Sequence, residues 1–159
     1  MVDFYALPQQ GDRAWPGRAA ASGIGAGVKA SCVEVALAKD LSNEAGTSFN
    51  PNRFVPFVVM HEFEGLLFSD CQAFSQGIGR ADLEPQFQRI RGDFPTPEDI
   101  NDSPVTCPSR RVRDVVPGYE KPLFGTLAAM EIGLTRIRAH CPHFDGWLRQ
   151  LESRAHLSV

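Results

Sequence analysis

The segment from residue 54 to residue 70 constrains the fold more than any other part of the chain. It opens with the apolar run Phe54–Met60, the best candidate for a strand, in which Pro56 indicates an edge position or a bulge. The run leads directly into His-Glu-Phe-Glu-Gly-Leu-Leu-Phe-Ser-Asp, residues 61–70, with one imidazole and three carboxylates. Parallel α/β proteins place their chemistry at the carboxyl ends of strands. The sequence therefore predicts an α/β fold with a polar site directly after this strand.

Length and composition predict one globular domain over residues 1–159. The chain is 43% hydrophobic and 22% charged, which is ordinary for a folded protein and argues against disorder. The net charge is −3, so binding of nucleic acid would need a local basic patch. No apolar run approaches the roughly 20 residues that span a bilayer, so we expect no membrane contact.

The N-terminus and the cysteines bear on where the protein works. The start, Met-Val-Asp-Phe-Tyr, lacks the basic residues and the long apolar stretch of a signal peptide. The four cysteines are widely spread and form no CxxC pair. We therefore expect reduced thiols and a cytoplasmic location. Residues 2–5 resemble the end of a strand with nothing before it to pair with, which hints at a truncated N-terminus.

Helical spacing of apolar residues predicts most of the remaining elements. Pro95–Pro108 carries four prolines and is predicted to be a loop with one turn at Pro97–Ile100. The predicted helices are Lys29–Leu41, residues 61–68, Leu83–Ile90, Pro122–Arg138 and Phe144–Leu151.

Glu62 and Glu64 are candidates for binding a divalent metal or for acting as a general base. On a helix, two residues that lie two positions apart are separated by roughly 200°, so both carboxylates are not expected in one small site. Glu62 is favoured because it lies closer to the end of the predicted strand. The alternative is that these acids only stabilise the first turn of a helix, where they meet the positive end of its dipole.

Two further groups could add to such a site. Asp3, at the end of a short apolar segment, is placed to hold a hard cation such as Mg²⁺, although an aspartate there can also cap a turn. The acidic loop at 97–104 leads into Arg110 and Arg111, whose guanidinium groups suit phosphate oxygens. The alternative for this second group is a solvated loop whose acids and arginines pair with one another.

These motifs together resemble the DUF4276 family, bacterial proteins of unassigned function often encoded near ATPase genes. The series His-Glu-Phe-Glu-Gly-Leu-Leu-Phe is the most specific element. The resemblance is carried by Val2–Tyr5, Trp15–Gly17, Phe54–Asp70, Ile100–Pro104, Pro108–Arg111, Tyr119–Lys121 and Cys141–Phe144.

The family is similar to the TOPRIM fold of primases, topoisomerases and the overcoming-lysogenization-defect nucleases. The resemblance implies an open, mostly parallel sheet flanked by helices, with a helical C-terminal part. It also implies acids from two strands around Mg²⁺, of which Asp3 matches the later-strand aspartate. The second acid of that Asp-x-Asp pair is absent, and Glu62 or Glu64 would replace it. Family members begin with an earlier strand that ends in Glu-Gly, which is missing before Met1.

The resemblance therefore predicts a phosphodiester-cleaving protein that depends on Mg²⁺ or Mn²⁺. It would act on nucleic acid in anti-phage defence, with an ATPase of the AAA or ABC type as partner. The expected metal ligands are Asp3, Glu62 and Glu64, of which Asp3 and Glu62 are also the catalytic residues. The expected substrate-binding residues are His61, Arg110, Arg111 and Lys121. Two other interpretations stay open, a non-catalytic module that binds an ATPase and a toxin–antitoxin component.

Overall fold

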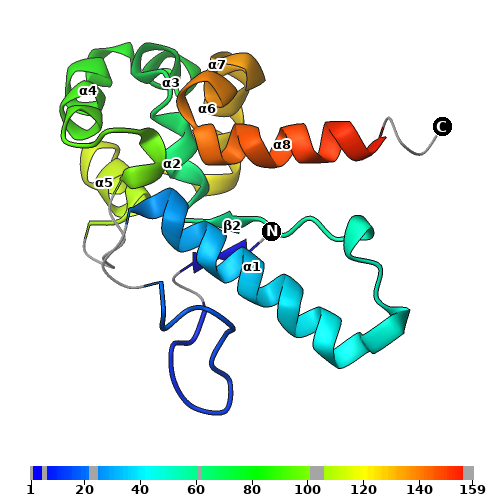
Figure 1. Ribbon diagram of the computed structural model, residues 1–159. Coiled ribbons are helices and arrows are strands. Elements are labelled where there is room, and N and C mark those ends of the chain that lie inside the picture. Colours follow the sequence, from blue (N-terminus) through cyan, green and yellow to red (C-terminus); the bar gives the residue numbers. More distant parts are fainter. Residues whose placement is uncertain (1, 5–6, 22–24, 61, 101–105, 156–159) are drawn as a thin grey trace. The chain divides into compact units, whose positions relative to one another are not determined.

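The computed structural model describes residues 2–4, 7–21, 25–60, 62–100 and 106–155. The chain divides into two compact units, which are described separately below (Figure 1). Unit 1 comprises Met1–Met60 and Gly146–Val159, and unit 2 comprises His61–Asp145. That residues 1–159 form one domain stays a prediction.

Unit 1 is built on a two-stranded parallel sheet. Strand β1 (Val2–Asp3) pairs with β2 (Val58–Val59) in the register Val2 to Val58 and Asp3 to Val59. Helix α1 (Ala26–Ala45) runs beside β2, and a carboxylate oxygen of Glu34 on α1 accepts a hydrogen bond from the backbone N–H of Val58 at 2.8 Å. The core beneath α1 consists of Phe4, Leu7, Ala21, Ala26, Ala30, Val33, Val58 and Met60. Because this bond takes up the N–H of Val58, the sheet is tied to α1 as well as covered by it.

Strand β2 is much shorter than the predicted strand Phe54–Met60. Pro56 has no N–H to donate to a ladder. The carbonyls before it bond instead to side chains of α8 (Pro142–Ala155), with Arg154 donating to residues 51, 52 and 54 and Trp147 to Val55. The carbonyls of residues 51, 52, 54 and 55 thus have partners outside the sheet, which is why this half of the run is not a strand. Two short 3-10 turns, Gly46–Ser48 and Pro51–Arg53, connect α1 to this segment.

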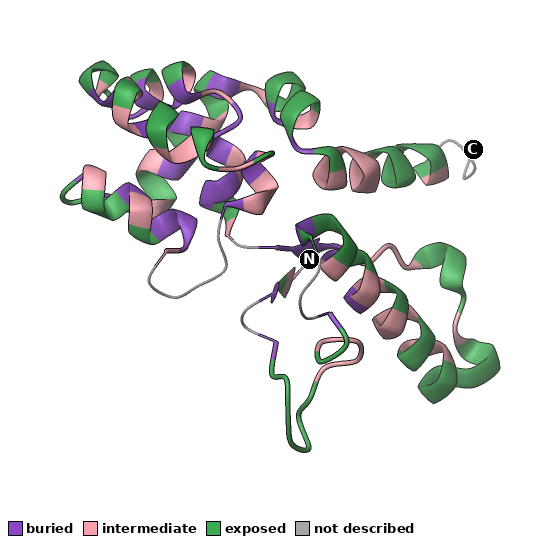
Figure 2. Ribbon diagram, turned by 60° about the vertical axis from the view of Figure 1, so that its left-hand side comes forward, coloured by how far each residue is buried: buried purple, intermediate pink, exposed green. Residues whose placement is uncertain are grey.

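Unit 2 is a cluster of short helices around an aromatic centre. Its elements are α2 (Phe63–Leu67), α3 (Cys71–Gly77), η4 (Ala81–Leu83), α4 (Glu84–Gly92), η5 (Pro97–Asp99), α5 (Pro108–Val115), α6 (Lys121–Ile132) and α7 (Leu134–His140). The rings of Phe74 and Phe87 stack at 4.3 Å, and Phe68 meets both of them edge-on. Figure 2 shows buried positions on these helices where they face one another, whereas α1 has few.

The prediction of one continuous helix over Pro122–Arg138 is wrong. Gly133, with φ of 76°, separates α6 from α7 and its N–H closes α6 by bonding to Ala129. A positive φ is accessible to glycine because it has no Cβ. Helices α3 and α5 were not predicted, whereas α1, α2, α4 and α8 confirm the predicted helices with shifted ends.

The described residues therefore form a mixed α/β chain dominated by helices. The sheet seen in them has two parallel strands, and the wider open sheet of the TOPRIM type stays a prediction. In the described part of the chain, none of the helices has the length and apolarity that a membrane crossing needs.

Close packing of α3 against α6 gives the first testable prediction. A Cβ on Gly77 would lie 2.8 Å from the Cα of Ala128 and 3.0 Å from the carbonyl oxygen of Leu127, both parts of a helix backbone that cannot yield easily. Gly77→Ala is therefore expected to lower the free energy of unfolding by about 1 to 3 kcal/mol in urea denaturation.

Gly146→Ala is the matched control for this variant. Gly146 lies inside α8, and its Cβ would meet no atom within 4 Å. Alanine there should stabilise the protein by about 0.5 to 1 kcal/mol through helix propensity. Equal effects of the two substitutions would show that α3 and α6 do not pack as closely as described.

Candidate functional site

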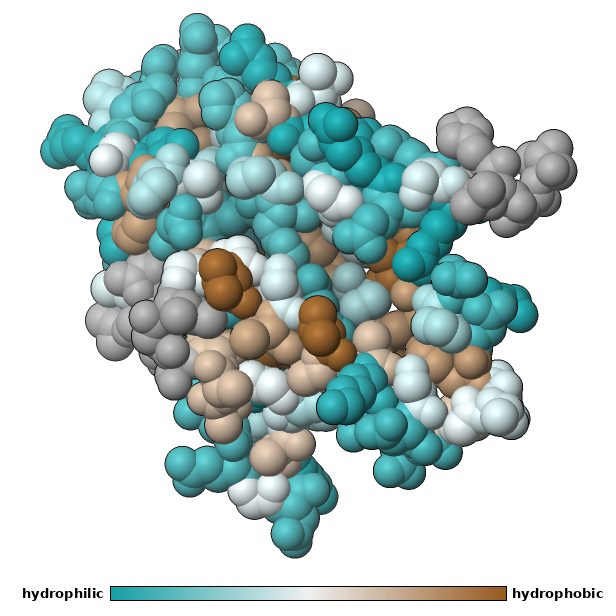
Figure 3. Space-filling model, in the orientation of Figure 1, coloured by the Kyte–Doolittle hydropathy of each residue, from teal (hydrophilic) through white to brown (hydrophobic). Residues whose placement is uncertain are grey.

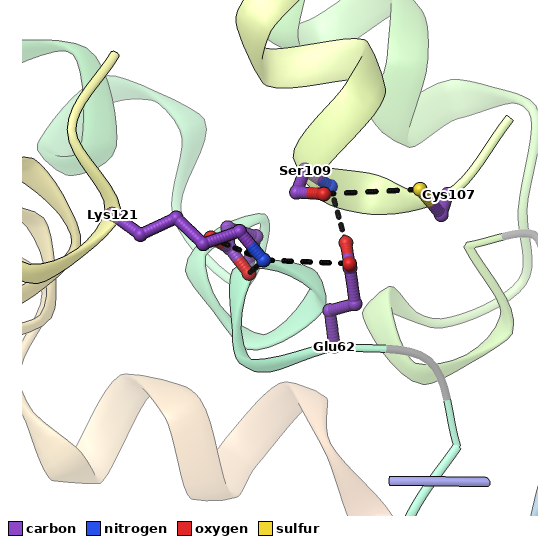
Figure 4. A network of polar contacts seen from close by, with 5 residues as sticks. Glu62, Cys107, Ser109 and Lys121 are labelled. Carbon is purple, nitrogen blue, oxygen red and sulfur yellow. Dashed lines mark hydrogen bonds and ion pairs between the residues drawn. The ribbon is translucent and has the colours of Figure 1, made fainter. Parts of the chain in front are cut away.

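Glu62 and Glu64 converge on the ammonium group of Lys121. Nζ of Lys121, the first residue of α6, lies 3.4 Å from a carboxylate oxygen of Glu62 and 3.2 Å from one of Glu64 (Figure 4). The side chain of Glu64 is 3% exposed, that of Glu62 19% and that of Lys121 39%. The three side chains form the site described below and are called the Glu–Lys cluster.

The two glutamates were not expected to share one small site, and this expectation is wrong. It assumed that both are helical, but Glu62 has an extended backbone, with φ of −154° and ψ of 162°, and directly precedes the first residue of α2. Only Glu64 lies in the helix. The change from extended to helical backbone between them lets both carboxylates reach one ammonium group.

Helix α5 contributes the second partner of Glu62. The backbone N–H of Ser109, near the start of this helix, donates to a Glu62 carboxylate oxygen at 2.7 Å. The first N–H groups of a helix have no partner within the helix, and the helix dipole favours a negative charge there. The Ser109 hydroxyl in turn lies 3.8 Å from Sγ of Cys107 (Figure 4). Glu62 therefore links the segment before α2 to both α5 and α6.

These contacts keep Glu62 ionised. Burial by itself raises the pKa of Glu62, but hydrogen bonds from the Ser109 side chain and backbone, together with the charge and hydrogen bond of Lys121, outweigh it. The pKa of this carboxyl therefore lies below its ordinary value of 4.5. At neutral pH the group is an anion and acts as a ligand or an acceptor rather than as an acid.

The third acid of the 61–70 cluster has a structural role. Asp70 is the N-cap of α3 and accepts a hydrogen bond from the backbone N–H of Ala73 at 3.0 Å. It also pairs with Arg136 at 3.3 Å. His61 lies outside the described residues, so its expected role in substrate binding stays a prediction.

The acidic loop also has structural contacts. The carboxylate of Glu98 accepts hydrogen bonds from the backbone N–H groups of His143 and Phe144, both at 2.9 Å, and so caps the start of α8. Burial raises the pKa of Glu98 despite these bonds. Asp99 forms a capping box with Thr96, and residues 101–105 lie outside the described part.

The paired arginines do not meet at one point. Nε of Arg111 donates to the carbonyl of Thr106 at 2.7 Å, and its guanidinium carbon lies 5.2 Å from the ring centre of Phe94. Arg110 pairs with Asp114 at 3.2 Å on an exposed surface of α5. Lys121 is thus the one predicted substrate-binding residue that the described residues show beside the glutamates.

Asp3 belongs to unit 1, whereas the Glu–Lys cluster belongs to unit 2. It is exposed at the end of β1, opposite Val59 in the sheet register. A metal site shared by Asp3 and Glu62 stays a prediction.

The Glu–Lys cluster offers some of the oxygen ligands that a hard cation such as Mg²⁺ needs. Among the described residues, no group of three or more histidines, cysteines, aspartates or glutamates is arranged to hold a metal ion. Mg²⁺ is, however, commonly bound through one or two carboxylates, with waters and substrate phosphates completing its octahedron. Glu62 and Glu64 offer two such carboxylates, and the Lys121 ammonium between them would have to move aside.

Sequence reasoning missed Ser109 as a partner of Glu62. The available signal was Pro108, because proline is favoured at the first position of a helix and so marks where free N–H groups lie. Pro108 would therefore have predicted the start of α5, where the free N–H of residue 109 can stabilise a negative charge. Which acid occupies that end could not be read from the sequence, since 47 positions separate the two residues.

Comparison with known proteins identifies a family. The family model described as "Domain of unknown function (DUF4276)" matches residues 1–152, which is nearly the whole chain. No curated protein and no solved structure matches the chain.

The lowered pKa of Glu62 predicts an acid-dependent part of the stability. Because this pKa is lower in the folded state, ionised Glu62 stabilises the fold above its unfolded value near 4.5, and the contribution is lost as the pH falls through the folded value. Glu62→Gln should therefore cost about 1 to 2 kcal/mol at pH 7, and the difference from wild type should shrink below pH 4.5. Urea denaturation between pH 7 and pH 3 measures this.

Glu131→Gln serves as the control for that series. Glu131 is an exposed residue of α6, the helix that carries Lys121. Its replacement should change the stability little at any of these pH values. A Glu62→Gln effect that is the same at pH 7 and at pH 3 would contradict the ionised contacts described here.

Proposed function

The chain belongs to the DUF4276 family, and from the Glu–Lys cluster we propose that it cleaves phosphodiester bonds of nucleic acid with the help of Mg²⁺ or Mn²⁺. The observation that carries the proposal is the buried carboxylate of Glu64, paired with a lysine that is open to solvent. Burying a carboxylate is costly, and a purely structural ion pair can often be replaced by apolar side chains without loss of stability. Perturbed, partly accessible charge clusters are therefore candidates for function.

Each residue of the cluster has a defined task in this proposal. Glu62 and Glu64 would hold the cation, with Glu62 fixed by the N–H of Ser109. Lys121, the most exposed of the three, would bind a phosphate oxygen as a compact point charge. The bound metal would supply charge neutralisation at the phosphate and an activated water. Phosphate contacts of this kind carry no sequence information, so we expect a substrate preference by strand type rather than by base.

The wider prediction extends beyond unit 2. In it, Asp3 is a further metal ligand, His61, Arg110 and Arg111 assist phosphate binding, and the sheet is the open TOPRIM type. The protein would act in the cytoplasm with an ATPase partner, as part of anti-phage defence. These residue roles, the open sheet, the location and the partner are supported by the family resemblance rather than by contacts among the described residues.

Cleavage of labelled DNA and RNA oligonucleotides with Mg²⁺ or Mn²⁺ tests the proposal. Glu64→Gln and Glu62→Gln keep the side-chain shape and remove one negative charge each. Each is expected to lower the cleavage rate by roughly a hundredfold or more, because the cation that would neutralise the phosphate charge and activate the water loses a ligand. Glu131→Gln should cleave like wild type. If wild type does not cleave, or if both cluster variants cleave at its rate, the proposal is wrong.

A second candidate function, a module that binds an ATPase, is favoured by an exposed apolar stripe in unit 2. The stripe consists of Leu123, Leu127, Met130 and Leu134, which are 52%, 42%, 75% and 54% exposed. The first three lie on α6 at spacings of four and three residues, so they share one face of the helix, and Leu134 begins α7. Apolar patches of this kind mark protein interaction sites. Val28 and Val35 of α1 are exposed as well. Figure 3 shows isolated hydrophobic spots on an otherwise mixed surface.

Charge substitution within the stripe tests the second candidate. Met130→Glu is expected to abolish co-purification with an ATPase encoded nearby, because it puts a carboxylate at the most exposed apolar position. Thr135→Glu, on the exposed surface of α7, is the control and should leave the complex intact. Binding that survives Met130→Glu would exclude the stripe as the interface.

A further inference from the structure

Helix α5 carries three arginines, two of which are bonded within the protein. Arg110 pairs with Asp114 at 3.2 Å, and Nε of Arg111 donates to the carbonyl of Thr106 at 2.7 Å. Arg113 is exposed and forms no hydrogen bond or ion pair with any of the described residues. Arg110 and Arg111 would have to give up a bond in order to bind a ligand, whereas Arg113 would give up none.

Helix geometry places Arg113 next to the Glu–Lys cluster. Arg113 follows Ser109 by four positions in α5, so the two residues are neighbours on one face, about 6 Å apart along the helix axis. Long side chains on a helix extend toward its N-terminus, so we expect the guanidinium of Arg113 over the turn that carries Ser109. The backbone N–H of Ser109 donates to a Glu62 carboxylate oxygen at 2.7 Å. Arg113 therefore borders the cluster on the side of α5, and Lys121 borders it on the side of α6.

The charges of Arg113, Glu64 and Glu62 also act on one common neighbour, the hydroxyl of Tyr119. Burial raises the pKa of this hydroxyl, the charge of Glu64 raises it further, that of Arg113 lowers it and that of Glu62 raises it. Since the effect of a charge falls with distance, the guanidinium and the two carboxylates lie in one neighbourhood. This agrees with the position that the helix geometry gives to Arg113.

The Glu–Lys cluster by itself is negative. Two carboxylates face one ammonium group, at 3.4 Å and 3.2 Å, and a phosphodiester that approaches them is itself an anion. A guanidinium suits a phosphate, because its fork of N–H donors matches two phosphate oxygens. An exposed arginine at the border of the cluster can therefore offset part of the repulsion between the carboxylates and a phosphate.

We propose that Arg113 binds a phosphate of the nucleic-acid backbone on the α5 side of the Glu–Lys cluster. This inference rests on the proposed function and adds a residue to it. Such a contact reads no bases, so it would hold a strand at the site whatever its sequence. The alternative is a structural role, because a cation in the last turn of a helix also stabilises that helix through its dipole. Loss of the charge would change the salt dependence of binding in the first case and the stability in the second.

The test measures binding of a labelled oligothymidine of about 12 nucleotides by fluorescence anisotropy, between about 50 and 200 mM salt. Ca²⁺ replaces Mg²⁺ in order to measure binding without cleavage. Arg113→Gln should weaken binding about threefold to tenfold. It should also lower the steepness of log K against log salt by about 0.7, the value for one phosphate contact with a single strand. Arg113→Lys keeps the charge and should keep the steepness of wild type.

Arg89→Gln is the matched control. Arg89 is an exposed arginine in the last turn of α4, in the same unit, and it likewise forms no hydrogen bond or ion pair with any residue that the structure describes. Its replacement should leave both the affinity and the salt dependence unchanged. Equal losses in Arg89→Gln and Arg113→Gln would show a general effect of charge and overturn the proposal.

Urea denaturation without ligand provides a second readout. Because Arg113 is exposed and unbonded, Arg113→Gln should unfold at the midpoint of wild type. A fall in the midpoint together with unchanged binding would show the structural role and overturn the proposal. Wild-type affinity and salt dependence in Arg113→Gln, a reduced steepness in Arg113→Lys, or no binding by wild type would overturn it as well.

Failure here is distinguishable from failure of the proposed function. If Arg113→Gln binds the oligonucleotide like wild type while Glu64→Gln loses cleavage, the role of Arg113 is wrong and the cleavage proposal stands. If binding depends on Arg113 but no oligonucleotide is cleaved with Mg²⁺ or Mn²⁺, the phosphate contact stands and the catalytic proposal is wrong.

Discussion

The buried carboxylate of Glu64 is the constraint on which the arrangement of unit 2 depends. A carboxylate that is 3% exposed needs a countercharge, and the ammonium of Lys121 provides it at 3.2 Å. This pair fixes the start of α6 beside α2, and Glu62 extends the connection to the first turn of α5 through Ser109. Polar contacts thus bring the start of α2 together with the starts of α5 and α6, which lie much later in the sequence. The apolar core has to be compatible with this arrangement. It is, because α3 packs closely against α6 at Gly77.

Part of this arrangement was predictable from local sequence. The spacing of apolar residues identified α1, α4 and α8. The change from apolar to polar residues after Met60 identified the position of the polar site. Local pattern failed where long-range contacts decide the structure. Residues 54–57 have the composition of a strand, but the carbonyls of Phe54 and Val55 bond to Arg154 and Trp147, about a hundred positions later. The interruption at Gly133 was missed because apolar spacing continues through it.

The candidate site was likewise predictable only in part. The sequence identified the acids, the lysine and the family motifs, yet it could not show which acids meet. Asp70, Glu98 and Asp99 carry the same chemistry as Glu62 but serve as helix caps. The difference lies in what surrounds each carboxylate after folding. Asp70, Glu98 and Asp99 accept hydrogen bonds from backbone N–H groups at helix starts, whereas the carboxylate of Glu62 shares one ammonium group with a second carboxylate, that of Glu64. Only the folded contacts separate these cases.

The three side chains of the Glu–Lys cluster differ in how far they are exposed, and this difference bears on the function of the site. An ion-pair network that only stabilised the fold would gain little from burial, because the desolvation cost of the charges offsets their attraction. Here Glu64 is buried, Glu62 is partly covered and Lys121 is the most exposed, so the cluster opens toward solvent on the side of the lysine. A phosphate that approaches from this side meets the positive group first, and drawing Lys121 toward it would loosen the contacts with both carboxylates. The oxygens freed in this way are those that a divalent cation could bind, so substrate and metal would favour each other at the site.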